Sequence, residues 1–202
     1  APQLARIRRQ LGQRFARARL QAAGVEVLAG TARFVSPEVF EADGRRLRFG
    51  RAILATGASP GVSTIDGADR LECLTSENLG QLARVPGSLA VIGTDGTACQ
   101  LAQAFGRLGS QVHVIGCGSL LLPDLETEAG QMIQTQLLEE GVRIHLDCSE
   151  VSVDKTGDRP TLTLVHGEQR QKLFVDAVFL DGPAEPNLLD LELPVGKVQC
   201  NA

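Results

Sequence analysis

The chain has 202 residues, of which 43% are hydrophobic and 22% are charged, a composition typical of a folded protein with one or two cores. Its formal net charge of −4 argues against a general nucleic-acid surface. No apolar run approaches the ~20 residues that a membrane-spanning helix needs, and no signal peptide is evident. We therefore expect a cytoplasmic protein that binds neither membranes nor nucleic acids.

The first 61 residues predict a helix followed by short strands. Pro2 to Ala23 forms an amphipathic pattern with a solvated arginine face, and Gly24 ends it. Alternating apolar residues then predict four short strands, at 25–28, 32–35, 46–49 and 51–54. A turn is expected at Asp43-Gly44. A loop over 55–61 closes this section.

The next part of the chain alternates strands and helices. A linker with a short helix at 76–82 leads to a strand at 89–92, a helix, and a second strand at 112–115. A helix over Glu126–Glu140 and a strand at 142–145 follow. Three more strands complete the pattern, and we expect them to form an antiparallel meander: 150–153, 161–165 and 174–180. The expected class is α/β, with a Rossmann-like parallel sheet and an antiparallel β-meander.

Residues 88–115, SLAVIGTDGTACQLAQAFGRLGSQVHVI, are the most informative stretch. A strand, a Gly-containing turn, a helix and a second strand make the first half of a dinucleotide-binding βαβ unit, which directs the helix N-terminus at a phosphate. The fingerprint G-x-G-x-x-G/A falls on Gly93, Asp95 and Ala98, with Thr94 and Gly96 completing the turn. We therefore predict a cofactor site at this turn.

Asp95 stands where the fingerprint has its second glycine, and two interpretations are open. As a cofactor-site residue, its carboxylate would oppose a diphosphate and offset the about 0.3–1 kcal/mol that a helix dipole contributes. As an N-cap, its side-chain oxygen would accept a hydrogen bond from the first turn of the helix, in an Asp-Gly turn. We favour the N-cap.

The end of the second strand also departs from the fingerprint. Gly116 and Cys117 stand where NAD-binding proteins place an acidic residue and NADP-binding proteins an arginine. These positions therefore favour neither NAD nor NADP, and they lack the ribose-binding side chain of the fingerprint.

The remaining polar residues give no catalytic or metal motif. The five cysteines are odd in number and irregular in spacing, which argues against a disulfide framework and a zinc site: 73, 99, 117, 148 and 200. The histidines, 113, 145 and 166, are far apart in sequence, and each is expected to be an ordinary strand residue. We predict no catalytic residue and no metal site in this chain.

Four segments carry a resemblance to a known family: RAILATGASP (51–60), LTSENLGQLARVPGSLAVIG (74–93), LAQAFGRLGSQVHVI (101–115) and VDAVFLDGPAEPN (175–187). They resemble the FAD-dependent pyridine nucleotide-disulfide oxidoreductases, and the mercuric reductase branch most closely. The resemblance spans essentially the whole chain, in the family's order.

The resemblance implies cofactor roles for particular residues. Thr56 and Gly57 would be flavin-side backbone residues, and Gly93 and Ala98 would face the NAD(P) diphosphate. Gln100 stands where the family usually has Glu near the nicotinamide, and the family's A-x-G-R-x-P-N becomes residues 181–187 without its Gly-Arg pair.

The resemblance also implies that the chain is the central piece of a longer flavoprotein. Residues 1–60 would belong to the FAD domain, 61–87 to a linker and crossover, 88–183 to the NAD(P) domain, and 184–202 to a segment returning to the FAD domain. The parent, a homodimer, would pass hydride from NAD(P)H through FAD to a cysteine pair and an acceptor such as Hg(II). The fragment, whose partner is the rest of that polypeptide, would not be catalytic alone.

Two alternatives remain open. Asp95 and the Gly116-Cys117 step are compatible with a degenerate Rossmann scaffold or interaction module that no longer binds a dinucleotide. The parent is also compatible with a lipoamide or glutathione-type reductase.

Overall fold

The structure is a computed structural model, and it describes residues 17–60, 65–180 and 184–200. Two compact units divide the chain: residues 60–184 form one, and residues 1–59 with 185–202 form the other. None of the helices in the described residues is long and apolar enough to cross a membrane.

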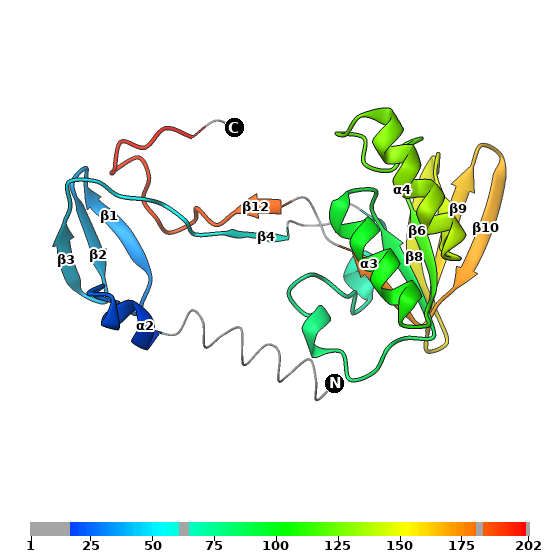
Figure 1. The fold of residues 1–202 in the computed structure, drawn as a ribbon, viewed down its shortest axis with the longest axis horizontal. Coiled ribbons are helices and arrows are strands. Elements are labelled where there is room, and N and C mark those ends of the chain that lie inside the picture. The colour runs from blue at the N-terminus through cyan, green and yellow to red at the C-terminus, as the bar shows by residue number, and fades with distance from the viewer. Residues whose placement is uncertain (1–16, 61–64, 181–183, 201–202) are drawn as a thin grey trace. The chain divides into compact units, whose positions relative to one another are not determined.

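A four-stranded parallel sheet forms the centre of the 60–184 unit (Figure 1). Its order is β11 (Ala177–Leu180), β5 (Ser88–Ile92), β6 (Gln111–Ile115) and β7 (Arg143–His145). These strands are almost continuously apolar because both faces of the sheet are covered. Helices α3 (Gly96–Arg107) and α4 (Thr127–Glu139) connect β5 to β6 and β6 to β7, as the sequence predicts.

The two faces of this sheet contribute to different cores. Leu89, Val91, Val112 and Val114 pack with α3 and with buried residues of the α4 side. The alternate positions, Ala90, Ile92 and Ile115 among them, pack against the meander. The unit therefore has three layers, with the parallel sheet in the middle, and this fixes the strand ends that position the candidate site.

The meander consists of β8 (Glu150–Thr156), β9 (Arg159–His166) and β10 (Gln169–Phe174). The prediction of a third meander strand over 174–180 is wrong. The chain bends at Val175-Asp176, and β11 leaves the meander to pair in parallel with β5, Ala177 facing Leu89. The apolar run continues through this bend because Val175 is itself buried, so the pattern gave no sign of two strands.

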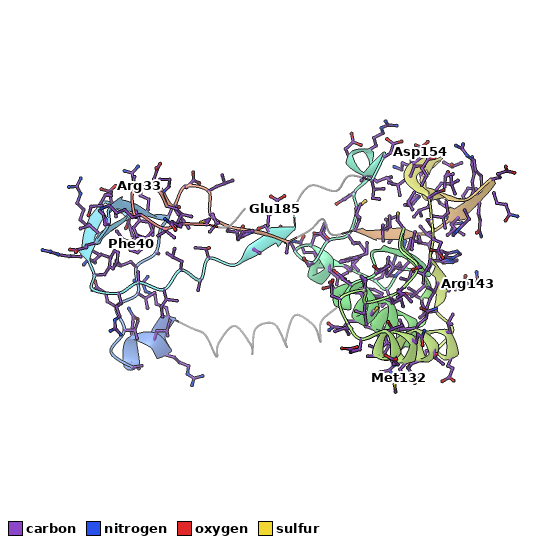
Figure 2. All side chains as sticks on the ribbon, turned by 90° about the horizontal axis from the view of Figure 1, so that it is seen from above. Arg33, Phe40, Met132, Arg143, Asp154 and Glu185 are labelled. Atoms are coloured by element: carbon purple, nitrogen blue, oxygen red, sulfur yellow. The ribbon has the colours of Figure 1, made fainter. Side chains whose placement is uncertain are left out.

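The second unit is built on a small antiparallel sheet of β1 (Ala32–Ser36), β2 (Val39–Ala42) and β3 (Arg45–Arg48). Figure 2 shows Phe40 on this sheet, where its ring centroid lies 4.2 Å from that of Phe34. Leu191 and Leu193, from the C-terminal segment, are buried against Phe34. The predicted turn at Asp43-Gly44 is confirmed, with both residues at positive φ.

The N-terminal helix is described only as α2 (Arg17–Ala22); the rest of the predicted helix lies outside the described residues. Two predicted strands are wrong. At 25–28 the Val27 carbonyl accepts a hydrogen bond from Arg17 Nη2 instead of pairing with a strand, and residues 51–54 are exposed, with Ile53 92% exposed. Residues 58–60 instead form β4 (Ala58–Pro60), which pairs with β12 (Ala184–Pro186). Strand propensity without a partner does not make a strand.

Short 3-10 helices occupy the linker region. η1 (Ala68–Arg70) follows Gly67, and η2 (Leu79–Gln81) lies within the predicted helix at 76–82. Asp66 accepts a main-chain hydrogen bond from Val153, 2.8 Å away, and so attaches the linker to β8. Gly67 has φ +81, and a Cβ there would collide with the Val153 carbonyl oxygen.

This contact predicts that Gly67→Ala destabilises the 60–184 unit more than the matched substitution Gly141→Ala. Gly141 has a nearly equal φ of +86, but a Cβ added there would meet nothing within 4 Å. Backbone strain alone should cost about 1 kcal/mol at Gly141, and strain plus overpacking about 3 kcal/mol at Gly67. Urea unfolding measures both, and equal losses would contradict the close approach of the linker to β8.

Candidate functional site: the turn between β5 and α3

The turn after β5 is held by glycine geometry and a main-chain bond. Gly93 has φ +143, a conformation that L side chains rarely adopt, and its N–H donates to the Ile115 carbonyl, 2.9 Å away, at the end of β6. Its Cα faces Ala98, whose Cβ would lie 3.5 Å from a Cβ on Gly93. The small residue at 98 therefore lets α3 pack closely on the turn, as the fingerprint requires.

Asp95 is the N-cap of α3, so the interpretation favoured from the sequence is confirmed. Its Oδ1 accepts a hydrogen bond from the Ala98 N–H at 2.8 Å, and its own backbone is extended. The first N–H groups of a helix have no intrahelical acceptor. Asp95 satisfies that of Ala98, which leaves the N–H groups of Gly96 and Thr97 as the donors that the helix end offers to an anion.

Thr94 covers the end of β6. Gly116 is buried, and a Cβ on it would collide with Thr94 Cγ2 and lie 3.3 Å from Leu146 Cδ2. The Thr94 carbonyl also accepts a hydrogen bond from Leu122 N, 2.7 Å away, so the loop after β6 is attached to the turn. The side chain that other dinucleotide-binding proteins carry at this strand end therefore has no room at position 116, and the next residue, Cys117, is exposed.

Gln100 lies on the second turn of α3 and is exposed. It lines a groove of about 350 Å³ between α3 and α4, together with Cys99, Leu122 and Leu125. Burial raises the pKa of the Cys99 thiol, and the nearby charge of Asp95 raises it further. Cys99 is consequently protonated at neutral pH and packs from α3 into the core.

Thr56 and Gly57 lie in the other unit. Asn187 connects to both: its Nδ2 donates to the Thr56 carbonyl at 3.2 Å, and its N–H donates to the Gly57 carbonyl at 3.0 Å. Gly57 has φ +74, which explains why a glycine is needed there. Of the segment 181–187, residues 181–183 lie outside the described residues.

The structure thus brings together most of the predicted site residues around one turn. Eight lie at the β5–α3 turn, on α3 or at the β6 end: Gly93, Thr94, Asp95, Gly96, Ala98, Gln100, Gly116 and Cys117. Thr97 was not among the predicted residues, although its N–H is one of the two available donors; its place as the second residue of α3 was the signal that could have identified it.

A histidine–cysteine cluster was not predicted from the sequence, although each of the three histidines is a strand residue, as expected. His113 Nδ1 lies 3.0 Å from His145 Nε2, and the rings stack with centroids 5.2 Å apart. Cys148 Sγ lies 3.5 Å from His166 Nε2. His113 and His145 meet because β6 and β7 are paired, and His166 of β9 reaches Cys148 because the meander covers this face of the sheet. Among the described residues, no group of three or more such side chains is arranged to hold a metal ion.

Burial controls the charge of this cluster. It lowers the pKa of His113 to about 4, assisted by the charges of His145 and Arg143. It also lowers the pKa of His145, with His166 and Arg143 as further causes. Both imidazoles are therefore neutral at neutral pH, when one can donate its N–H to the other.

Comparison with known proteins connects this geometry to a family. The family model described as "Pyridine nucleotide-disulphide oxidoreductase" matches residues 5–198. Mercuric reductase of Acidithiobacillus ferrooxidans is 35% identical over 185 residues, covering 88% of this chain and 32% of that protein. Dihydrolipoyl dehydrogenase of Bacillus subtilis is 28% identical over 173 residues, covering 84% and 37%. The chain therefore spans about a third of the length of these relatives.

Solved structures share the fold. LpdA of Mycobacterium tuberculosis superposes with a TM-score of 0.75 at 25% identity, covering 92% of this chain and 42% of that one. The HOCl-induced flavoprotein disulfide reductase RclA of Escherichia coli gives a TM-score of 0.72 at 23% identity, covering 88% and 40%.

The Thr94–Gly116 contact predicts a coupled pair of substitutions. Gly116→Ala should destabilise the unit by about 1–3 kcal/mol, because its new methyl group meets Thr94 Cγ2. Thr94→Ser removes only that methyl group, so the double variant should recover more than about 0.5 kcal/mol beyond the sum of the single effects. Urea unfolding of the four proteins measures the coupling, and strict additivity would refute the contact.

The histidine pair predicts an acid-sensitive unit. An unfolded histidine binds its proton near pH 6.5 and folded His113 near pH 4, so between these values the unfolded state holds more protons and stability falls as the pH is lowered. The loss should be on the order of 2 kcal/mol across this window. As the pH is lowered from 6.5 to 4, the urea midpoint of His113→Gln should fall less steeply than that of the wild type. Identical slopes for the two proteins would mean that His113 does not titrate as described.

Proposed function

Because the chain belongs to the pyridine nucleotide-disulphide oxidoreductase family, we propose that its 60–184 unit binds the dinucleotide of a flavoprotein oxidoreductase, with residues 1–59 and 185–202 belonging to the flavin domain of the same enzyme. The diphosphate would bind at the N-terminus of α3. The relatives that are named mercuric reductases make reduction of Hg(II) the first acceptor chemistry to test.

The geometry of the β5–α3 turn is the observation that supports this proposal. Gly93 keeps the positive φ that lets the main chain approach a ligand without a side chain between them. Gly96 and Thr97 offer two N–H groups at the positive end of the helix dipole. These residues fit a diphosphate, although the ribose end of the site lacks the acid or arginine of the fingerprint.

The chain's own side chains would bind and orient rather than react. When bound, NAD(P)H supplies a hydride that such enzymes pass through FAD to a cysteine pair and then to the acceptor. Gln100, one turn into α3, can donate or accept a hydrogen bond but carries no charge. In the other unit, Asn187 would hold the Thr56-Gly57 main chain in the conformation required beside the flavin.

A degenerate scaffold is the second candidate, and two observations favour it. The Asp95 carboxylate occupies the helix end that a phosphate would approach, and Thr94 fills the space over Gly116 at the end of β6. The Asp95 carboxylate thus takes the place of a phosphate at the helix end, and Thr94 fills space that a ribose-binding side chain would otherwise occupy. On this alternative, the unit keeps its layers for packing or interaction and binds no cofactor.

Relatives also include a dihydrolipoyl dehydrogenase, so the acceptor and the parent's dimerisation are further proposals that depend on the rest of the polypeptide.

Isothermal titration of NADH and NADPH into the 202-residue chain distinguishes the two main candidates. The proposed function predicts binding of at least one dinucleotide with a sub-millimolar Kd. No heat of binding for either would favour the scaffold.

Substitution of Asp95 tests the charge at the site. Asp95→Gly should tighten dinucleotide binding, because it removes a carboxylate beside the diphosphate and frees the Ala98 N–H. Asp95→Asn is the matched control, since its amide oxygen can keep the cap while the charge is lost. We expect a gain of roughly tenfold for Asp95→Gly, with Asp95→Asn between it and the wild type. Unchanged or weaker binding for both would place the diphosphate elsewhere.

A further inference from the structure

Cys117 and Cys148 lie at the ends of neighbouring parallel strands. Cys117 follows β6 by two residues and Cys148 follows β7 by three. The main chain joins the two segments on both sides of Cys117: Cys148 N–H donates to the Gly116 carbonyl at 3.2 Å, and Asp147 N–H donates to the Gly118 carbonyl at 2.9 Å.

This pairing meets the main requirement for a disulfide. The two hydrogen bonds hold the main chain of residue 117 beside that of residues 147 and 148, as in neighbouring strands, which lie about 4.7–4.9 Å apart. Disulfides join residues whose Cα atoms are about 4.4–6.8 Å apart. Burial raises the pKa of the Cys148 thiol, and the charge of Cys117 raises it further, as expected for two thiols within electrostatic reach of each other.

The two thiols differ in ways that suit a stepwise oxidation. Cys117 is exposed, so it can meet an oxidant in solution. Cys148 is 1% exposed, and its Sγ lies 3.5 Å from His166 Nε2, an imidazole able to accept the thiol proton. Formation of the bond requires the Cys148 sulfur to leave His166 and meet the Cys117 sulfur.

We propose that Cys117 and Cys148 form a reversible disulfide that regulates the ribose end of the candidate dinucleotide site. The regulatory part of this inference rests on the proposed function, because Cys117 is one of the predicted cofactor-site residues. The bond itself does not depend on dinucleotide binding.

The reaction takes place as two thiol–disulfide exchanges with a low-molecular-weight disulfide as oxidant. The Cys117 thiolate attacks one sulfur of oxidised glutathione, forms a mixed disulfide and releases one glutathione thiolate. Cys148 then loses its proton to His166 and attacks the Cys117 sulfur, which releases the second glutathione thiolate. Two protein thiols are oxidised, one external disulfide is reduced to two thiols, and the protons end on glutathione.

The bond should weaken dinucleotide binding. It would replace the exposed Cys117 side chain with a bridge that holds the end of β6 against the loop after β7, where Gly116 already packs under Thr94. We expect roughly tenfold weaker binding in the oxidised chain, restored by dithiothreitol.

Disulfide mapping tests the inference directly. The folded 202-residue chain is equilibrated with oxidised glutathione, alkylated, and digested without reduction for mass spectrometry. We expect a peptide pair joined through Cys117 and Cys148, lighter by two hydrogen atoms than the separate thiol peptides. Cys73→Ser is the matched control and should keep this pair.

Two variants separate the steps. Cys148→Ser should leave glutathione attached at Cys117, because no resolving thiol is present. His166→Gln should slow the second exchange at least about tenfold without slowing the first, and should change its pH dependence. Circular dichroism checks that each variant is folded.

The wild-type result decides the proposal even if a variant fails to fold. Complete glutathione attachment at Cys117 without a bond to Cys148 would overturn it, as would a bond from Cys117 to Cys200 or Cys73. A 117–148 bond in a chain that binds neither dinucleotide would instead support the disulfide and refute the proposed function.

Discussion

The rest of the candidate site depends on the hydrogen bond from the Ala98 N–H to Asp95 Oδ1. It fixes the first turn of α3, and α3 connects the two central parallel strands, β5 and β6. Gly93 bonds to the end of β6, so the turn, the helix end and the second strand form one rigid arrangement. The same bond places a negative charge at the helix end that would receive a phosphate. Stability of the turn and affinity for an anion are therefore opposed at one residue.

Local patterns were sufficient to predict this arrangement. The apolar run of β5, the helical spacing in α3 and the Asp-Gly pair each carry their own signal, and Asp95 capped the helix as its residue type favours. Features that depend on distant partners were not predictable. β11 joins the parallel sheet rather than the meander, and residues 51–54 have strand-like composition yet stay exposed. Pairing in a sheet is a tertiary property, so composition alone could not reveal either.

The contacts at the end of β6 explain why the sequence departs from the dinucleotide-binding fingerprint there. Gly116 occurs at the end of β6 because Thr94 Cγ2 occupies the position of any side chain there. The sequence shows only that the usual acid is missing; it cannot show that a neighbour from the β5–α3 turn fills the space. The histidines and Cys148 are a similar case. His113 and His145 meet because β6 and β7 pair, and His166 reaches Cys148 because the meander folds over the sheet. Their separation in sequence concealed a cluster.

The central claim is that a dinucleotide diphosphate binds at the amides of the α3 N-terminus. Amide NMR of the chain, recorded during titration with NADPH or NADH, tests it most directly because it reports on individual N–H groups. The account predicts that the largest shifts fall on Gly96 and Thr97, with smaller shifts at Gly93 and Cys117. Saturable shifts confined to other parts of the unit, or none up to millimolar dinucleotide, would contradict it.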